Sequence, residues 1–587
     1  MVLRGVKIII LAAFLTAGCQ PKAPPEVTAS PPPAMAEAGD EIFGNGKSSS
    51  GLGNYLASIY AERHGSPSNA GDFLLAALKS DPENIDLLNR AYLLMIEEGR
   101  EDEAIMLAKR ILRQNPQATL PILTLMIRDV KEGGFRAAEN RLAAIPDKGF
   151  NKFLKLLMLS WVLVGEERID EAITTLEPLS ESSGFSVLRD LHTGLIYDVS
   201  GRLMEAEAGY DKALESGNPM SFRLVELFGS FYERFGRVDR AKELYDGYLR
   251  QNPDLILIGP TMMRLERNEP PEIIIGTVLE GMSEALFNIS SALHQEGATR
   301  MGLIYTRMAL ALRPDFPIAL ALIAEIFDMQ GRSEEAIEIY EAIPADSPYR
   351  GLVDLRIALN LEALGRTDEA IARLEQLAKD NSERFDVLIS LGDIWRGKED
   401  FIKAVKAYDR AIERIGKLEK QHWALLYARG IALERSGEWP QAETDFLRAL
   451  ELSADQPYVL NYLGYSWVDK GINLDKAKKM IWRAVELRPT DGYIIDSQGW
   501  VLYRLGDYAG AVKSLEKAIE FKPQDPTIND HLGDAYWRIG RMFEARFQWK
   551  RALALDPEPK EAEKIKNKIE FGLPEIDSKS PADGRSS

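Results

Sequence analysis

The 587-residue sequence is poor in the side chains from which disulfides and metal sites are built. It holds one cysteine, so no disulfide can form within the chain. Its five histidines are far apart and never at zinc-binding spacing: His64, His192, His294, His422 and His531. No GxSxG nucleophile elbow and no HExxH motif occurs. We therefore expect no metal, no cofactor and no enzymatic activity.

Basic residues are outnumbered by acidic ones, and long apolar runs are scarce. The net charge is −18, whereas binding to phosphate backbones requires a basic surface, so we expect no nucleic-acid partner. No apolar run reaches the roughly 20 residues that a membrane-spanning helix needs. The string "GNGKSSSG" fails as a phosphate-binding loop because Glu41 stands where the first glycine belongs, and we expect no small-molecule substrate.

The single cysteine, Cys19, follows a segment with the features of a targeting signal. Arg4 and Lys7 supply positive charge, residues 8–15 form a short apolar run, and residues 16–18 are small. The string "LTAGC" resembles the lipobox of bacterial lipoproteins, whose cysteine is lipidated and becomes the mature N-terminus. An ordinary cleaved secretory signal and an uncleaved anchor are the alternatives.

The lipobox resemblance implies a signal peptide at 1–18 and a lipid anchor on Cys19. Each methylene buried in the bilayer contributes about 0.8 kcal/mol to the free energy of membrane binding. The two or three acyl chains of such lipoproteins therefore suffice for stable attachment. In that family an aspartate after the cysteine favours the inner membrane. Gln20 stands there instead, which implies the outer membrane and its periplasmic face. Residues 19–50 are rich in proline and small residues and predict a disordered linker.

From residue 51 onward the sequence repeats itself, mostly every 34 or 35 residues. The repeating small residues are Ala70, Ala104, Ala138, Ala172, Ala206, Ala241, Gly302, Ala336, Ala370, Ala404, Ala442, Ala477, Ala511 and Ala545. In the last three units a glycine and a proline recur as well: Gly464, Gly499, Gly533, Pro489, Pro523 and Pro557. This pattern resembles the tetratricopeptide repeat, a 34-residue unit of two antiparallel helices.

The repeating residues have a physical reason. Glycine and alanine let the two helices approach closely, and proline follows the second helix because it cannot continue one. The sequence therefore predicts an all-α fold, an α-solenoid coiled into a right-handed superhelix of about 14 helix pairs. The expected parts are an N-terminal array at 51–253, an insertion or degenerate half-repeat at 254–281, a C-terminal array at 282–557, a capping helix at 558–571 and a disordered tail at 572–587.

A stack of helix pairs presents an extended concave groove lined by the first helix of each pair. In the last three repeats the repeat phase points eight polar and aromatic residues inward: Asn461, Tyr465, Asp496, Trp500, Tyr503, Asp530, Asp534 and Trp537. Aromatic and hydrogen-bonding side chains on adjacent turns suit a peptide or a partner helix. The alternative is that they are ordinary inner-surface residues with no ligand.

Two stretches carry a more specific resemblance, residues 307–377 and residues 462–553, which begins "YLGYSWVDKGINLDKAKKMIWRAVELRP". Together with the lipobox they resemble the long outer-membrane tetratricopeptide lipoproteins of the LbcA type. That resemblance implies a scaffold that binds a periplasmic C-terminal processing protease and presents peptidoglycan hydrolases to it. The alternative is an assembly scaffold for an outer-membrane protein, secretion or pilus machine. Scaffolds of that kind have about five or six repeats, so the length of this array favours the protease adaptor.

Overall fold

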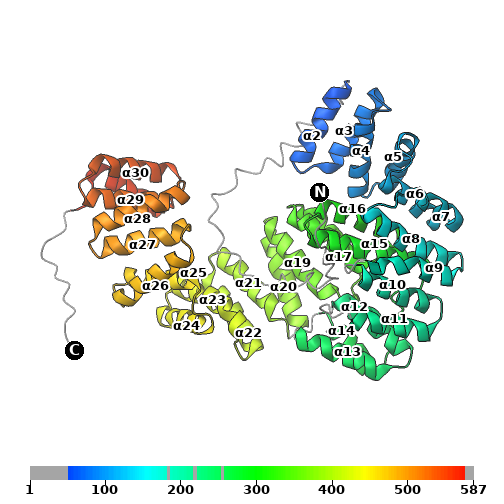
Figure 1. Ribbon diagram of the computed structural model, residues 1–587. Coiled ribbons are helices and arrows are strands. Elements are labelled where there is room, and N and C mark those ends of the chain that lie inside the picture. Colours follow the sequence, from blue (N-terminus) through cyan, green and yellow to red (C-terminus); the bar gives the residue numbers. More distant parts are fainter. Residues whose placement is uncertain (1–49, 182–184, 216–220, 253–256, 382, 575–587) are drawn as a thin grey trace. The chain divides into compact units, whose positions relative to one another are not determined.

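The computed structural model describes residues 50–574 except 182–184, 216–220, 253–256 and 382. The predicted signal peptide, Cys19, nearly all of the linker and the tail beyond residue 574 lie outside these ranges. Within them every regular element is a helix, and the thirty α-helices form fourteen consecutive pairs, with α14 and α31 unpaired (Figure 1). The predicted all-α solenoid is confirmed.

The chain divides into two compact units, and the boundary falls between Leu377 and Ala378, inside α20. The boundary lies within the predicted C-terminal array of residues 282–557. The helices of unit 1 are α2 (Gly51–Arg63), α3 (Pro67–Ser80), α4 (Ile85–Glu97), α5 (Glu101–Gln114), α6 (Thr119–Lys131), α7 (Phe135–Leu142), α8 (Phe150–Gly165), α9 (Ile169–Leu176), η1 (Glu177–Glu181), α10 (Ser186–Val199), α11 (Leu203–Glu215), α12 (Phe222–Arg234), α13 (Val238–Gln251), α14 (Gly259–Glu266), α15 (Val278–Gln295), α16 (Thr299–Leu312), α17 (Pro317–Met329), α18 (Ser333–Glu341), α19 (Arg350–Ala363) and α20 (Thr367–Asp380). Those of unit 2 are α21 (Phe385–Gly397), α22 (Phe401–Ile415), η2 (Lys420–His422), α23 (Trp423–Arg435), α24 (Trp439–Leu452), α25 (Pro457–Asp469), α26 (Leu474–Leu487), α27 (Gly492–Arg504), α28 (Tyr508–Phe521), α29 (Pro526–Arg538), α30 (Met542–Ala554) and α31 (Pro559–Phe571).

Local sequence signals set the helix boundaries in each pair. Asp525 caps α29, its carboxylate accepting from the backbone N–H of Ile528 at 2.9 Å. The turn between α29 and α30 needs Gly540, whose φ of 84° is in the left-handed region that glycine tolerates. The same conformation recurs between α27 and α28 at Gly506, with φ 83°.

The repeating small residues lie where the two helices of a pair cross. Ala511 and Ala545 are completely buried. A Cβ on Gly533 would come within 2.4 Å of Trp549 Nε1, and one on Gly499 within 2.6 Å of Leu515 Cγ. The short residues therefore make room for the large side chain of the facing helix, because protein interiors are close-packed.

In unit 1, the helix pair α15–α16 packs against the first helices of earlier pairs. Helix α16 packs against α4 and α6, while α15 packs against α8 and α10 (Figure 1). The fit is close, since a Cβ on Gly281 of α15 would lie 2.1 Å from Cη2 of the fully buried Trp161 on α8. The first helices α4, α6, α8 and α10 are therefore covered by a later helix pair of the same unit.

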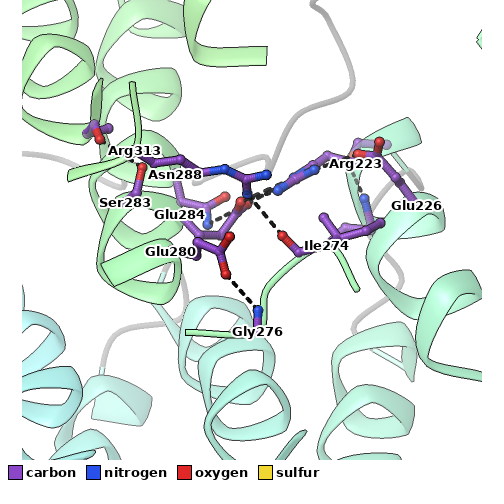
Figure 2. A network of polar contacts seen from close by, with 12 residues as sticks. Arg223, Glu226, Ile274, Gly276, Glu280, Ser283, Glu284, Asn288 and Arg313 are labelled. Atoms are coloured by element: carbon purple, nitrogen blue, oxygen red, sulfur yellow. Dashed lines mark hydrogen bonds and ion pairs between the residues drawn. The ribbon is translucent and has the colours of Figure 1, made fainter. Parts of the chain in front are cut away.

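A buried ion-pair network joins α15 to α12, the first helix of the pair that follows α10 and α11 (Figure 2). Arg223 Nη2 donates to Glu284 Oε2 at 2.6 Å, and both side chains are at least 95 % buried. Arg223 Nη1 also donates to Glu226 at 2.6 Å. Arg313 donates to the carbonyl of Ile274, so the segment before α15 is held by the same region.

The region predicted as an insertion, 254–281, contains α14 and then leads into α15. None of the residues of α14 is buried. Helix α15 starts with a capping box in which Thr277 accepts from the N–H of Glu280 and the Glu280 carboxylate accepts from the N–H of Thr277. The segment thus leads to the pair that packs against α4, α6, α8 and α10.

Candidate protein-binding groove

The predicted groove residues all lie on the first helices of the last three pairs in unit 2. Asn461 and Tyr465 are on α25, Asp496, Trp500 and Tyr503 on α27, and Asp530, Asp534 and Trp537 on α29. Helix α25 packs on α27, and α27 packs on α29, so these helices lie side by side. These side chains differ in how many contacts they make with other residues of the protein.

The charged residues of this surface form a ladder from each repeat to the next. Arg504 donates to Asp469 at 3.2 Å, and the two are 35 residues apart. His531 Nδ1 lies 3.0 Å from Asp496 Oδ1 at the same separation. Lys568 donates to Asp534 at 2.9 Å over 34 residues. These acids therefore tie neighbouring helices together, which is a structural role that needs no ligand.

Trp500 is also engaged within the protein. Its ring stacks on Tyr503 with a centroid separation of 4.8 Å and an interplanar angle of 7°. It stacks on His531 with a separation of 4.1 Å and an angle of 16°. The Tyr503 hydroxyl in turn accepts from Arg538 Nε at 3.2 Å. Trp500 therefore takes part in the packing between α27 and α29.

The inner surface of the last repeat is covered by α31 and the residues after it. Lys568 of α31 donates to Asp530 at 2.7 Å in addition to Asp534. Trp537 packs on Trp549 at 5.4 Å, and a Cβ on Gly572 would come within 2.0 Å of its ring. Asp530, Asp534 and Trp537, predicted as groove residues, therefore serve to dock this terminal helix.

Three uncharged groups remain, on α25 and α27. Asn461 Oδ1 and Trp500 Nε1 are buried atoms with no hydrogen-bond partner among the residues that the structure describes. Tyr465 occupies the position on α25 that Trp500 has on α27, 35 residues on. Burial, together with the nearby carboxylates of Asp496 and Asp469, raises the pKa of the Tyr465 phenol, which is therefore a neutral donor and acceptor at physiological pH.

The ladder shifts the pKa of its titratable members. Burial lowers the pKa of His531, but the carboxylates of Asp496, Asp530 and Asp534 outweigh that effect, and the net pKa is raised above 6.5. Burial raises the pKa of Asp534, and Lys568 opposes this shift only in part. The carboxylates raise the pKa of Lys568 despite its burial. At neutral pH Lys568 is therefore charged, and a growing share of His531 becomes charged as the pH falls.

No cluster of three or more histidine, cysteine or acidic side chains is arranged to hold a metal ion in the described part of the chain. Over the same residues, the structure contains no helix of the length and apolar character required to cross a bilayer.

The sequence did not single out His531 or Lys568 as part of this surface. Both could have been found by searching for opposite charges 34 or 35 residues apart, because that separation brings equivalent positions of neighbouring repeats together. His531 has no other histidine at metal-binding spacing, and Lys568 lies in the segment that predicts a capping helix.

Comparison with known families supports the repeat assignment along several segments. The tetratricopeptide repeat family matches residues 192–256, 306–350, 355–419 and 396–457, and a second TPR repeat family matches 499–540. These segments match tetratricopeptide repeats. Together the matched ranges cover less than half of the chain.

Among curated proteins, the TPR repeat-containing protein PA4667 of Pseudomonas aeruginosa is 32 % identical over 154 residues, which are 26 % of this chain and 25 % of that protein. Cellulose synthase operon protein C of Escherichia coli is 26 % identical over 212 residues, 36 % of this chain and 17 % of that protein. The match thus spans a quarter or less of these relatives. The solved structure of yeast Tom70 aligns with 89 % of this chain at 15 % identity and a TM-score of 0.31.

Proposed function

We propose that this protein is a non-enzymatic scaffold of the bacterial cell envelope, whose unit 2 binds a segment of a partner protein along α25 and α27. The observation that carries this proposal is the contrast between the units. The first helices α4, α6, α8 and α10 of unit 1 are covered by α15 and α16. Helices α25 and α27, by contrast, pack against helices of their own and adjacent repeats.

The finer proposal is an adaptor for a periplasmic C-terminal processing protease that presents peptidoglycan hydrolases for degradation. Its support is the sequence resemblance at residues 307–377 and 462–553, and the lipobox-like string that ends at Cys19. A scaffold that holds both proteins would raise their effective concentration to about millimolar without a catalytic residue of its own. Attachment to the outer membrane would keep this assembly beside the cell wall.

The test is reconstituted degradation of a purified hydrolase by the protease, with and without the full chain. We expect the scaffold to be inert alone and to accelerate the protease. The double variant Asn461→Ala/Tyr465→Ala should weaken the binding of one of the two proteins. The matched control is Lys479→Ala/Lys513→Ala, which changes two exposed residues of the second helices α26 and α28. An unchanged degradation rate together with no binding of either protein would exclude the adaptor role.

The membrane tether has its own experiment. Cys19→Ser should remove the lipid and leave the protein mislocalised, because the sequence predicts that the lipid attaches the protein to the membrane. Fractionation and labelling with a radioactive fatty acid measure the two effects. Membrane association that persists in Cys19→Ser, in a protein that takes up no label, would exclude the lipoprotein assignment and leave the scaffold proposal to the degradation assay.

A further inference from the structure

We infer that the outward face of α30, the second helix of the last pair, docks on the surface of an anionic lipid bilayer. This α30 face consists of Phe543, Phe547 and Lys550, with Arg546 and Arg551 beside them. The inference goes beyond the proposed function, because the docking requires neither of the two partner proteins nor a lipid on Cys19.

The apolar part of the α30 face is a pair of exposed aromatic rings. Phe543 is 90 % exposed and Phe547 is 61 % exposed. They are four residues apart on one helix and therefore lie next to each other on the same side. The opposite side of α30 supplies Ala545, Trp549 and Ala552 to the core of the last repeat. Single exposed apolar residues are common on protein surfaces, but adjacent exposed rings are typical of a contact site.

The end of the chain offers little that could cover these rings. Helix α31 packs on α30, where Arg546 Nε donates to the Ile569 carbonyl at 3.1 Å, and both rings stay exposed beside it. The described chain ends at Pro574, whose carbonyl accepts from Arg538 of α29 at 2.7 Å. In residues 575–587 the one large apolar side chain is that of Ile576. The rings therefore suit an apolar surface from outside the chain.

The polar part of the α30 face is basic, although the protein has a net charge of −18. Helix α30 contains four charged residues: Glu544, Arg546, Lys550 and Arg551. The carboxylate of Glu544 already accepts from Arg541 Nε at 3.0 Å.

The three cations of α30 have no carboxylate partner among the residues that the structure describes. Lys550 is exposed and forms no ion pair there. Arg551 Nη2 donates to the Pro523 carbonyl at 3.0 Å, and the bond of Arg546 to the Ile569 carbonyl is likewise to a neutral group. Their positive charges are therefore available to an anionic surface.

An anionic bilayer complements both parts of the α30 face at once. Helices that lie at a bilayer surface insert phenylalanine and leucine and keep lysine and arginine at the headgroups. The rings protrude from the ridge of a helix, so a flat surface reaches them without a groove. Acidic residues elsewhere on the protein oppose the docking only weakly, because salt screens charges beyond about 8 Å at physiological ionic strength.

The experiment measures vesicle binding of the full chain with Cys19→Ser, which carries no lipid and no native thiol. Ala554→Cys adds a single thiol to the α30 face, four residues after Lys550, for a nitrobenzoxadiazole label. The vesicles contain phosphatidylcholine alone or equal parts of phosphatidylcholine and phosphatidylglycerol. We expect a blue shift of the label with the anionic vesicles, and the binding should weaken as salt is added. Binding to phosphatidylcholine should be about fivefold weaker or less.

Three variants test which side chains are responsible. Phe543→Ser/Phe547→Ser should lower the partition coefficient about tenfold or more, because two rings no longer leave water. Lys550→Gln should lower it about fivefold, which is the contribution of one basic residue near an anionic surface. The matched control is Leu52→Ser/Leu56→Ser, which removes an exposed apolar pair of the same spacing from α2 and should leave the partition coefficient unchanged.

The absence of a blue shift with both kinds of vesicle, or an equal loss of binding in the α2 control, overturns the inference. A blue shift with the purified protease or hydrolase, in a protein that does not respond to vesicles, assigns the α30 face to a protein partner and also overturns it. Vesicle binding in a protein that binds neither protease nor hydrolase supports the inference and removes the adaptor role.

Discussion

Arg332 and Glu98 are joined by two hydrogen bonds of 3.2 Å although 234 residues separate them in the chain. Glu98 follows α4, and Arg332 precedes α18. Arg300 donates to Glu97 at 2.6 Å, and Arg307 Nε donates to the Glu97 carbonyl at 3.0 Å, so the C-terminal end of α4 receives three arginines. Cations are favoured there because the helix dipole places negative partial charge at that end.

The first prediction concerns this pair. Arg332→Ala and Glu98→Ala should each destabilise unit 1, and the double variant should be less unstable than the sum of the two. The coupling energy should be about 0.5–3 kcal/mol, because the side chains are in direct contact and each is less than 15 % exposed. Urea unfolding of the four proteins in the cycle gives this energy. Strictly additive effects would mean that the pair is not formed in solution.

The second prediction concerns the contact between Gly281 and Trp161. Gly281→Ala places a methyl group where 2.1 Å separates it from the indole ring, and such overpacking costs about 1–3 kcal/mol. The control is Gly397→Ala, where a Cβ meets nothing within 4 Å. That change should be neutral or stabilising, since alanine is favoured over glycine in helices by roughly 0.5–1 kcal/mol. Thermal unfolding distinguishes the two, and equal effects would contradict the close packing of α15 on α8.

The third prediction concerns the docking of α31. Lys568→Met leaves Asp530 and Asp534 without their cation in a site where all three side chains are less than 20 % exposed. Removing one partner of a buried pair costs up to about 3–5 kcal/mol. Lys564→Met breaks only an exposed pair with Glu561 and should cost about 0.5 kcal/mol or less.

Hydrogen exchange of α29 and α31 measures the effect at position 568. Protection of α31 should fall in Lys568→Met and stay unchanged in Lys564→Met. If both variants keep α31 protected, Lys568 does not hold the terminal helix in place.

The fourth prediction is a pH dependence. His531 has a raised pKa in the folded protein because Asp496, Asp530 and Asp534 outweigh its burial. The protonated imidazole therefore stabilises the fold fully below pH about 6.5, the unfolded pKa, and this contribution is lost as the pH rises through the raised folded pKa. Unfolding of wild type and His531→Gln across that window tests the sign. The difference in stability should shrink as the pH rises, and a difference that grows would contradict the ion pair with Asp496.

Repeat spacing was enough to predict the helix pairs but not the closure of unit 1. The small residues at 34- or 35-residue intervals report contacts inside one pair, such as that of Gly533 with Trp549. The contact of Gly281 with Trp161, by contrast, joins helices 120 residues apart. Nothing periodic marks it, because a glycine inside a helix looks the same whether it faces its own pair or a distant one.

The groove prediction depended on the repeat phase alone. The repeat phase predicts which side chains point inward, but not whether they are already bonded to another residue of the protein. It placed Asp496, Asp530 and Asp534 on the first helices of their pairs, where the structure also has them. Whether an inward acid is available depends on the residue one repeat later, here His531 or Lys568. That information is in the sequence, but it becomes visible only when neighbouring repeats are compared position by position.

The way α15 and α16 pack back onto earlier helices also constrains how this protein can change over time. An open solenoid can gain or lose a repeat, because each unit contacts only its neighbours. In unit 1, the contacts of α16 with α4 and of α15 with α10 are made across a set number of intervening pairs. Inserting or deleting one pair between α5 and α13 would move Glu97 and Glu98 away from Arg300 and Arg332. These long-range contacts therefore require a fixed number of helix pairs in unit 1. Variation in length among related chains should therefore be concentrated in unit 2.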